Sequence, residues 1–184
     1  MSEIELLARN YERFVALPWQ NNVAGPERVW FAVYDPSQER RLRLRIPEFE
    51  IATKKAGHTW HYVDLTDAFA HWMAGHKYRE AYFKRPQLMT DAVLAGFKST
   101  VVDQIISALT APDVDSGSVV AGGGLASLFG LVLASDVLEA VSPSIRGRML
   151  GFFPGNYENK MYRLLDARDG WNYLAIPITA QAAR

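Results

Sequence analysis

Four short runs of apolar, β-branched and aromatic residues alternate along the chain with longer segments of helical periodicity. The runs are "RVWFAVYDP", "HTWHYVDL", "VVAG" and "RMLGFF", and each has the composition of a buried strand. Strands that are separated by helices are joined by crossovers, which place helices on both faces of a mostly parallel sheet. The pattern therefore predicts an α/β fold of three layers, α/β/α, with a Rossmann-like, mostly parallel sheet.

The segments around these runs predict the helices. In chain order, the expected helices are residues 3–16, 37–56, 68–83, 89–111 and 125–141, although the alternation of "RLRLRI" in the second would also suit a strand. Pro47 is expected to kink the second helix or to divide it, because proline lacks the amide hydrogen that a helix interior needs. After the fourth strand, "MYRLLD" and "WNYLAIPI" predict two more strands, which the tight "ARDG" connection would pair as an antiparallel C-terminal hairpin.

The length of 184 residues is that of one domain with a substantial core. We therefore expect residues 1–184 to form a single unit, with the N-terminal helix at 3–16 and the sheet and its helices within 28–178. The charge-free stretch 117–135 carries several glycines, so it predicts a buried strand, a turn and a core helix better than a membrane span.

The composition argues against several classes of protein. Hydrophobic residues make up 49% of the chain and charged residues 22%, which is typical of a folded domain. Twenty basic residues balance twenty acidic ones, so we expect no strong direct binding of DNA and no membrane association. The absence of cysteine excludes disulfides and thiol catalysis. Met1 leads into an acidic helix start and not into a signal peptide, so we expect a cytoplasmic protein.

The glycines Gly122, Gly123 and Gly124 stand between a predicted strand and a predicted helix, where backbone amides can cradle a phosphate. A P-loop would continue with lysine and serine or threonine, but Leu125 and Ala126 follow. We interpret the glycines as a tight turn at which a helix and a strand approach closely. A nucleotide-sensing module that uses residues 122–124 remains the alternative.

Two aspartates end predicted strands. Asp35 and Asp64 would lie close together if their strands are neighbours, and a carboxylate pair can bind Mg²⁺ or share a proton. A metal-dependent hydrolase is therefore a further alternative, although aspartate at a strand end commonly forms only a turn. His71 and His76 are five residues apart and would point to different faces of a helix, unlike zinc ligands. No nucleophile elbow is present, so we expect no enzyme, no metal and no cofactor.

The order of motifs from "SVVAGGGLASLFGLVLASDVLEAV" to "MLGFFPGNYENKMYRLLDARDGWNYLAIPI" resembles the end of the BrxB family, a small component of BREX bacteriophage-exclusion systems. The family pattern is a hydrophobic strand, a glycine turn and a leucine-patterned helix, followed by a Phe-Pro-Gly-x-Tyr turn, a strand with Arg and Leu, and a last strand with Tyr. The residues in the later places are Phe153, Pro154, Gly155, Tyr157, Arg163, Leu164 and Tyr173. The earlier "VYDP" and "VDL" resemble the first two strand ends of the family. The closing "RDGWNYLAIPI" is more elaborate than the family ending, which marks a divergent member.

The resemblance implies a non-enzymatic interaction subunit of a phage-defence assembly, which docks the phosphatase-like component PglZ and associates with other BREX components. Aromatic and arginine side chains anchor protein interfaces. The candidates for the partner surface are Pro154, Gly155, Tyr157, Arg163, Trp171 and Tyr173. Within this set, Pro154-Gly155 also predicts a type II turn with the glycine at positive φ. The oligomeric state is left open.

Overall fold

The computed structural model describes residues 1–167 and 172–181 of the protein. Its centre is a sheet in the order β2-β3-β4-β1-β6, in which all four pairings are parallel, and β5 pairs with the far end of β4. The strands are β1 Val29–Tyr34, β2 Thr59–Asp64, β3 Ser118–Gly123, β4 Arg148–Glu158, β5 Met161–Leu164 and β6 Ile176–Ile178. The predicted α/β fold with a mostly parallel sheet is confirmed.

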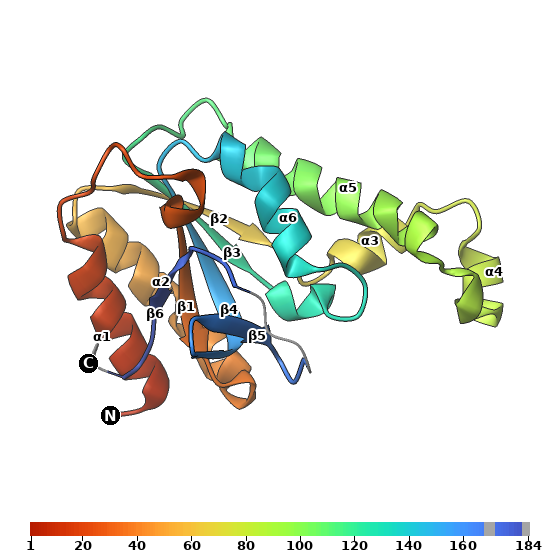
Figure 1. Ribbon diagram of the computed structural model, residues 1–184, viewed down its shortest axis with the longest axis horizontal. Coiled ribbons are helices and arrows are strands. Elements are labelled where there is room, and N and C mark those ends of the chain that lie inside the picture. Colours follow the sequence, from red (N-terminus) through yellow and green to blue (C-terminus); the bar gives the residue numbers. More distant parts are fainter. Residues whose placement is uncertain (168–171, 182–184) are drawn as a thin grey trace.

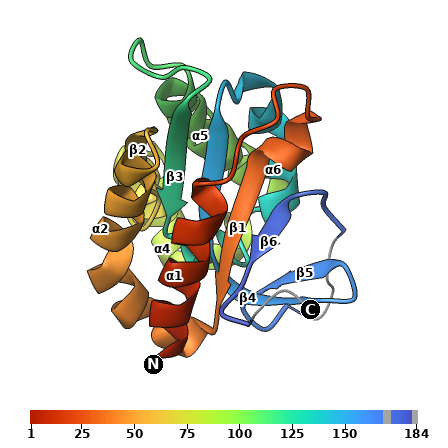
Figure 2. The same ribbon diagram turned by 90° about the vertical axis from the view of Figure 1, so that its left-hand side faces the viewer.

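Helices cover both faces of the sheet (Figures 1 and 2). They are α1 Glu3–Val15, α2 Glu39–Lys55, α3 Ala68–Ala74, α4 Arg79–Lys84, α5 Asp91–Leu109 and α6 Ala134–Val141. Side chains of α1 and α2 share one apolar cluster with the sheet, and those of α5 and α6 share another on the opposite face. The two clusters are the interfaces between three layers, as the alternation of strands and helices predicts.

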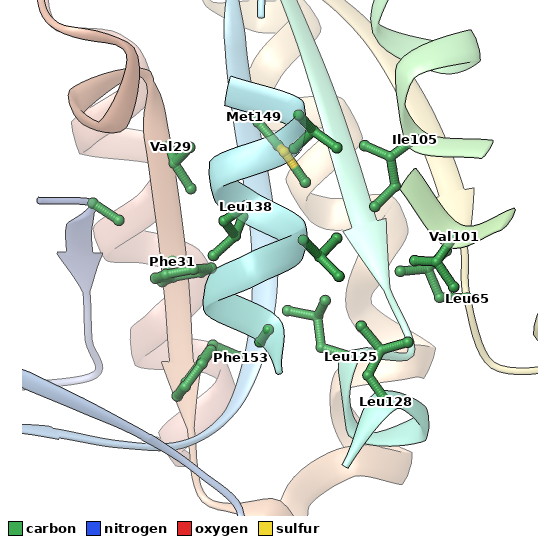
Figure 3. Close-up of a cluster of buried hydrophobic side chains, with 14 of the residues drawn as sticks. Val29, Phe31, Leu65, Val101, Ile105, Leu125, Leu128, Leu138, Met149 and Phe153 are labelled. Carbon is green, nitrogen blue, oxygen red and sulfur yellow. The ribbon is translucent and has the colours of Figure 1, made fainter. Parts of the chain in front are cut away.

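The central strand β1 explains why two cores form. All six of its residues are buried, and successive side chains point to opposite faces of the sheet. Phe31 therefore lies among the side chains of α5 and α6 (Figure 3), whereas Trp30 belongs to the cluster beneath α1 and α2. The ring of Phe31 lies against Gly151 of β4, where a Cβ atom would come within 2.8 Å of it, so only glycine fits beside the ring.

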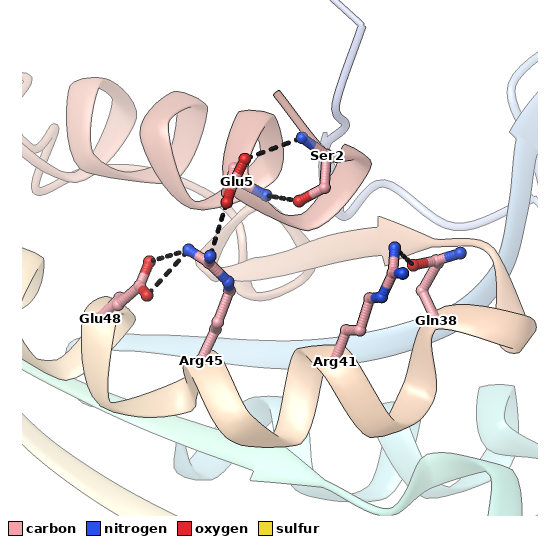
Figure 4. Close-up of polar contacts among 6 residues, drawn as sticks. All are labelled: Ser2, Glu5, Gln38, Arg41, Arg45 and Glu48. Atoms are coloured by element: carbon pink, nitrogen blue, oxygen red, sulfur yellow. Dashed lines mark hydrogen bonds and ion pairs between the residues drawn. The ribbon is translucent and has the colours of Figure 1, made fainter.

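Helices α1 and α2 are tied together by polar contacts. Ser2 and Glu5 form a capping box at the start of α1, and Arg45 of α2 donates to Glu5 at 2.6 Å and to Glu48 at 2.9 Å (Figure 4). Beneath them the hydroxyls of Tyr11 and Thr53 lie 2.6 Å apart in the buried interface. These contacts hold the two helices as one layer.

Three predicted helices differ from the observed ones. Helix α2 is not divided at Pro47, which is exposed, so that water can satisfy the carbonyl left without a partner. The segment 68–83 is two helices, because α3 ends at Gly75 and a turn precedes α4. The segment 125–141 contains only α6, since a 3₁₀ turn at Leu125–Leu128 and Gly130 at φ +75° precede it.

Helix α5 is long and apolar enough to cross a membrane by length and composition alone. One face of it, made of Phe97, Val101, Ile105 and Leu109, is buried in the core of the domain. Asp103 on the other side is exposed. This amphipathic arrangement is that of a helix that packs on a sheet.

The antiparallel hairpin is present, but its strands differ from the predicted ones. Strand β4 continues through Pro154 and Gly155, and it turns at Asn159 and Lys160 to pair with β5. Both turn residues have positive φ, of 52° and 62°, as a type I′ hairpin turn requires. The predicted pairing of the last two strands is therefore wrong, because β6 instead lies parallel to β1. The predicted type II turn is also wrong, since Gly155 lies within a strand.

Candidate functional site

Polar side chains gather at the carboxyl edge of the sheet, where α/β proteins commonly bind ligands. The hydroxyl of Tyr34, at the end of β1, donates to Glu39 in the first turn of α2. Glu39 accepts from Arg43 at 2.7 Å, and Arg43 donates to Thr66 Oγ1 at 2.9 Å. Thr66 in turn donates to Asp64, from its amide at 2.9 Å and from its hydroxyl. We call Tyr34, Glu39, Arg43, Asp64 and Thr66 the carboxyl-edge network.

The electrostatics of this network stabilise the charges that it contains. Partial burial acts to raise the pKa of Asp64, but the two hydrogen bonds from Thr66 and the charge of Arg43 outweigh it and lower that pKa. The hydrogen bond from Arg43 to Glu39 raises the pKa of the guanidinium. Burial raises the pKa of Tyr34, and its bond to Glu39 adds to the effect. A carboxylate with a lowered pKa is a poor general base, so the network favours a structural role.

The glycines form a tight junction, but not the predicted turn over residues 122–124. Strand β3 includes Gly122 and Gly123, and Gly124 alone has positive φ, at +77°. A Cβ atom on Gly124 would lie 2.4 Å from the amide nitrogen of Thr66. The helix expected directly afterwards is replaced by a four-residue 3₁₀ turn, so the glycines do not lead into the N-terminus of a long helix. The described edge thus lacks the helix that the nucleotide interpretation required.

Asp35 and Asp64 are not neighbours. Strands β4 and β3 separate β1 from β2, which places the ends of the two aspartate-bearing strands about 14 Å apart at the usual strand spacing. Asp35 accepts from the amide of Ser37 at 2.8 Å, and hydrogen bonds from Ser37 lower its pKa. Each aspartate therefore caps its own turn. Within residues 1–167 and 172–181 no group of three histidine or acidic side chains is placed to hold a metal ion.

An open cavity of about 380 Å³ lies beside the network, between α3 and α5. Asp64, Asp67, His71, Trp72 and Gln104 are among the residues that line it. The cavity is large enough for a small polar molecule. The Thr100 hydroxyl in its lining donates to the carbonyl of Gly96 at 3.1 Å, and its Asp64 carboxylate is already engaged by Thr66.

The residues expected on a partner surface are not all exposed. Pro154 and Gly155 are buried within β4, and Tyr157 is half-buried, with its ring centroid 4.6 Å from that of Tyr162. Arg163 is exposed on β5. Tyr173 is half-buried, and this burial raises its pKa. Trp171 lies outside the described residues. Of the six candidates, Arg163 is thus the one that the described structure leaves open to solvent.

A more accessible surface lies on a segment that begins within the predicted helix 68–83 and extends beyond it. Residues 76–88, which we call the basic arm, include α4 and stand at the far end of α5, away from the sheet (Figure 1). Tyr78 is 55% exposed and Phe83 is 67% exposed. The arm also carries four basic side chains against one acidic one: Lys77, Arg79, Lys84, Arg85 and Glu80. The local excess of basic residues was the signal in the sequence.

Aromatic contacts anchor the arm, and Arg79 is held by the carbonyl of Ala74 and by Glu80, whereas Tyr78 and Phe83 stay exposed. The imidazole of His76 lies 4.9 Å from the ring of Trp72 and 5.1 Å from that of the buried Tyr82, measured between centroids. Lys77 lies 5.3 Å above the ring of Tyr78. The exposed apolar and basic groups are therefore presented by a segment with fixed attachment.

No family model, curated protein or solved structure matches the chain.

Buried tyrosines predict a loss of stability at high pH. Burial raises the pKa of Tyr11, Tyr34 and Tyr162, whereas all three titrate near 10 in the unfolded chain. Above pH 10 the unfolded chain releases these protons while the folded protein keeps them. The contribution of each tyrosine to stability is therefore complete below pH 10 and is lost as the pH rises above it. We expect the free energy of unfolding to fall by about 1.4 kcal/mol per pH unit for each such tyrosine.

Urea unfolding between pH 9 and pH 11.5, with tyrosinate absorbance recorded in parallel, measures this slope. Tyr34→Phe should make the slope shallower by the contribution of one tyrosine. An absorbance rise from all tyrosines before any unfolding would contradict the prediction.

Proposed function

We propose that this chain is a non-enzymatic interaction subunit of a BREX-type phage-defence assembly and that it docks the PglZ phosphatase-like component. The resemblance of the C-terminal third to the BrxB family supports the assembly. The observation that carries the docking role is the basic arm, which exposes Tyr78 and Phe83 on a segment that projects from the domain. Exposed aromatics that are held in place are the usual anchors of protein interfaces.

The charge of the arm indicates what kind of surface it contacts. Lys84 and Arg85 follow Phe83 directly, and neither forms an ion pair within residues 1–167 or 172–181. An acidic surface on the partner would complement them and would accelerate association at low salt. The docking site on the PglZ-like protein is therefore proposed to be acidic around an apolar pocket.

The carboxyl-edge network supports the non-enzymatic part of the proposal. Its side chains satisfy one another, from Tyr34 to Asp64, and Gly124 is packed against Thr66. The network occupies part of the edge at which α/β proteins commonly bind a cofactor, and the cavity between α3 and α5 lies beside it. We propose that it stabilises the loops from which α3 and the basic arm continue.

The test is co-purification with the PglZ-like protein of the same genome, followed by measurement of Kd. Phe83→Ala and Tyr78→Ala should each weaken binding by about fivefold or more, because truncation of an anchor costs more than about 1 kcal/mol. Lys84→Glu should slow association, and the effect should shrink at high salt.

Leu17→Ala is the matched control, since Leu17 is 57% exposed but lies at the end of α1. All variants should melt within a few degrees of the wild type, as expected for exposed positions. Failure of the wild-type chain to bind the PglZ-like protein would overturn the proposal. Binding that is unchanged in both aromatic variants would remove the arm from the interface. Genes for a methyltransferase and a large ATPase beside this one would support the assembly.

A further inference from the structure

The two edges of the sheet are protected to different degrees. Edge strand β6 has three residues and contains Pro177, two features by which proteins prevent further pairing. Edge strand β2 has six residues, "TWHYVD", with neither proline nor lysine. Within residues 1–167 and 172–181, β2 pairs with β3 alone, and Figure 2 shows it at the rim of the sheet. An open edge of this kind is a template for another strand.

Helix α2 presents one side toward this edge. Arg43 donates to Thr66, which follows β2 by two residues, so the Arg43 side of α2 faces the β2 side of the molecule. Arg45, by contrast, reaches α1 on the other side of the helix (Figure 4). Positions 39, 43, 50 and 54 share the Arg43 side, because steps of four and seven residues return to one face of a helix. We call Glu39, Arg43, Glu50 and Lys54 the charge row.

The charge row alternates in sign along the helix. In the single chain Glu39 pairs with Arg43 at 2.7 Å, and Glu50 pairs with Lys54 at 2.6 Å. When such a row is laid antiparallel against a copy of itself, its order reverses. Glu39 then faces Lys54 of the copy, and Arg43 faces Glu50. The midpoint between positions 39 and 54 and the midpoint between positions 43 and 50 both fall between Ile46 and Pro47. A single twofold axis through this point therefore places each of the four charges opposite a charge of the other sign.

We propose that a second copy of this chain docks on β2 as an antiparallel strand, with the two charge rows side by side, to form a twofold dimer with a continuous sheet. A twofold interface must be self-complementary, and the charge row has that property. The basic arm does not have it, because four basic groups against one acidic group would repel a copy of themselves. Tyr62, which is 40% exposed on β2, would be covered in the dimer.

The first measurement is the mass of the full chain in solution, by sedimentation velocity from about 1 to 100 μM. We expect a species of twice the 20.7 kDa chain mass at the upper end of this range. Arg43→Glu should weaken dimerisation by about tenfold or more, because it places like charges opposite each other in a desolvated contact. Tyr62→Lys should do the same from the strand itself, since lysine on an edge strand opposes pairing.

A charge swap separates contacts between chains from those within one helix. In Arg43→Glu combined with Glu50→Arg, both pairs within the helix are repulsive, but position 43 again faces an opposite charge at position 50 of the copy. Recovery of the dimer in this variant supports the proposal. A wild-type chain of 20.7 kDa at 100 μM would overturn it. A dimer that survives both Arg43→Glu and Tyr62→Lys would also overturn it, because the contact would then lie elsewhere.

Discussion

Replacement of Gly155 by alanine is expected to destabilise the protein by about 3 kcal/mol, which is the upper range for an overpacked site. Gly155 lies in β4 opposite Leu164 of β5, and a Cβ atom on it would lie 1.9 Å from the carbonyl oxygen of Arg163. A backbone atom cannot rotate away as a side chain can, so the two strands must separate. Tyr162 would move with β5, and its hydroxyl donates to Ala175 at 2.6 Å from within the core.

The measurement is chemical unfolding of Gly155→Ala beside Gly122→Ala. Gly122 also lies in a strand, but no atom lies within 4 Å of the position that its Cβ would take. The control should therefore be neutral or stabilised by up to about 1 kcal/mol, through the lower entropy of its unfolded chain. Equal stability of the two variants would show that the contact at Gly155 relaxes freely.

Gly124→Ala is expected to cost about 4 kcal/mol, because an unfavourable backbone conformation and an overpacked contact act at once. The backbone at Gly124 has φ +77°, which is unfavourable for any side chain by about 1–2 kcal/mol. A Cβ atom there would also lie 2.4 Å from the nitrogen of Thr66 and 2.9 Å from its Cα, so the junction between β3 and the loop after β2 would open. The hydrogen bonds from Thr66 to Asp64 should weaken as a result.

Gly57→Ala isolates the first of these effects. Gly57 has φ +86°, and no atom lies within 4 Å of its Cβ position. Its replacement should cost only about 1–2 kcal/mol. Thermal or urea unfolding of both variants gives the difference, which is the cost of the clash with Thr66. If Gly57→Ala proved as damaging as Gly124→Ala, the close approach at Gly124 would carry no weight.

The strands could be predicted from the sequence because most of them are continuous apolar runs, and β1 is buried at every residue. The pairing of the last strands could not. A hairpin depends on the backbone of two turn residues, and Asn159-Lys160 lacks the glycine that usually reveals such a turn. Helix ends failed for a related reason, since the apolar pattern of residues 68–83 continues across the break at Gly75.

The candidate site was harder to predict because it depends on strand order. Asp35 follows β1 and Asp64 ends β2, and these strands are consecutive in the chain. In the sheet, however, β3 and β4 lie between them, because the connection from β1 to β2 crosses two strand positions. Local patterns carry no information on that distance. The link from Arg43 to Thr66 joins residues 23 positions apart, and it also depends on this crossover. The basic arm was within reach of sequence reasoning, because its charges and aromatics are consecutive.

The position of β1 has a consequence for synthesis of the chain. Its two neighbours in the sheet, β4 and β6, begin at Arg148 and Ile176, so the first strand to leave the ribosome is among the last to be paired. At usual elongation rates, the interval is on the order of ten seconds. During this time "VWFAVY", which has the composition of an aggregation-prone segment, has no strand partner. Until the C-terminal strands emerge, this segment of the nascent chain therefore stays available for non-native pairing, which chaperones that bind extended apolar segments would prevent.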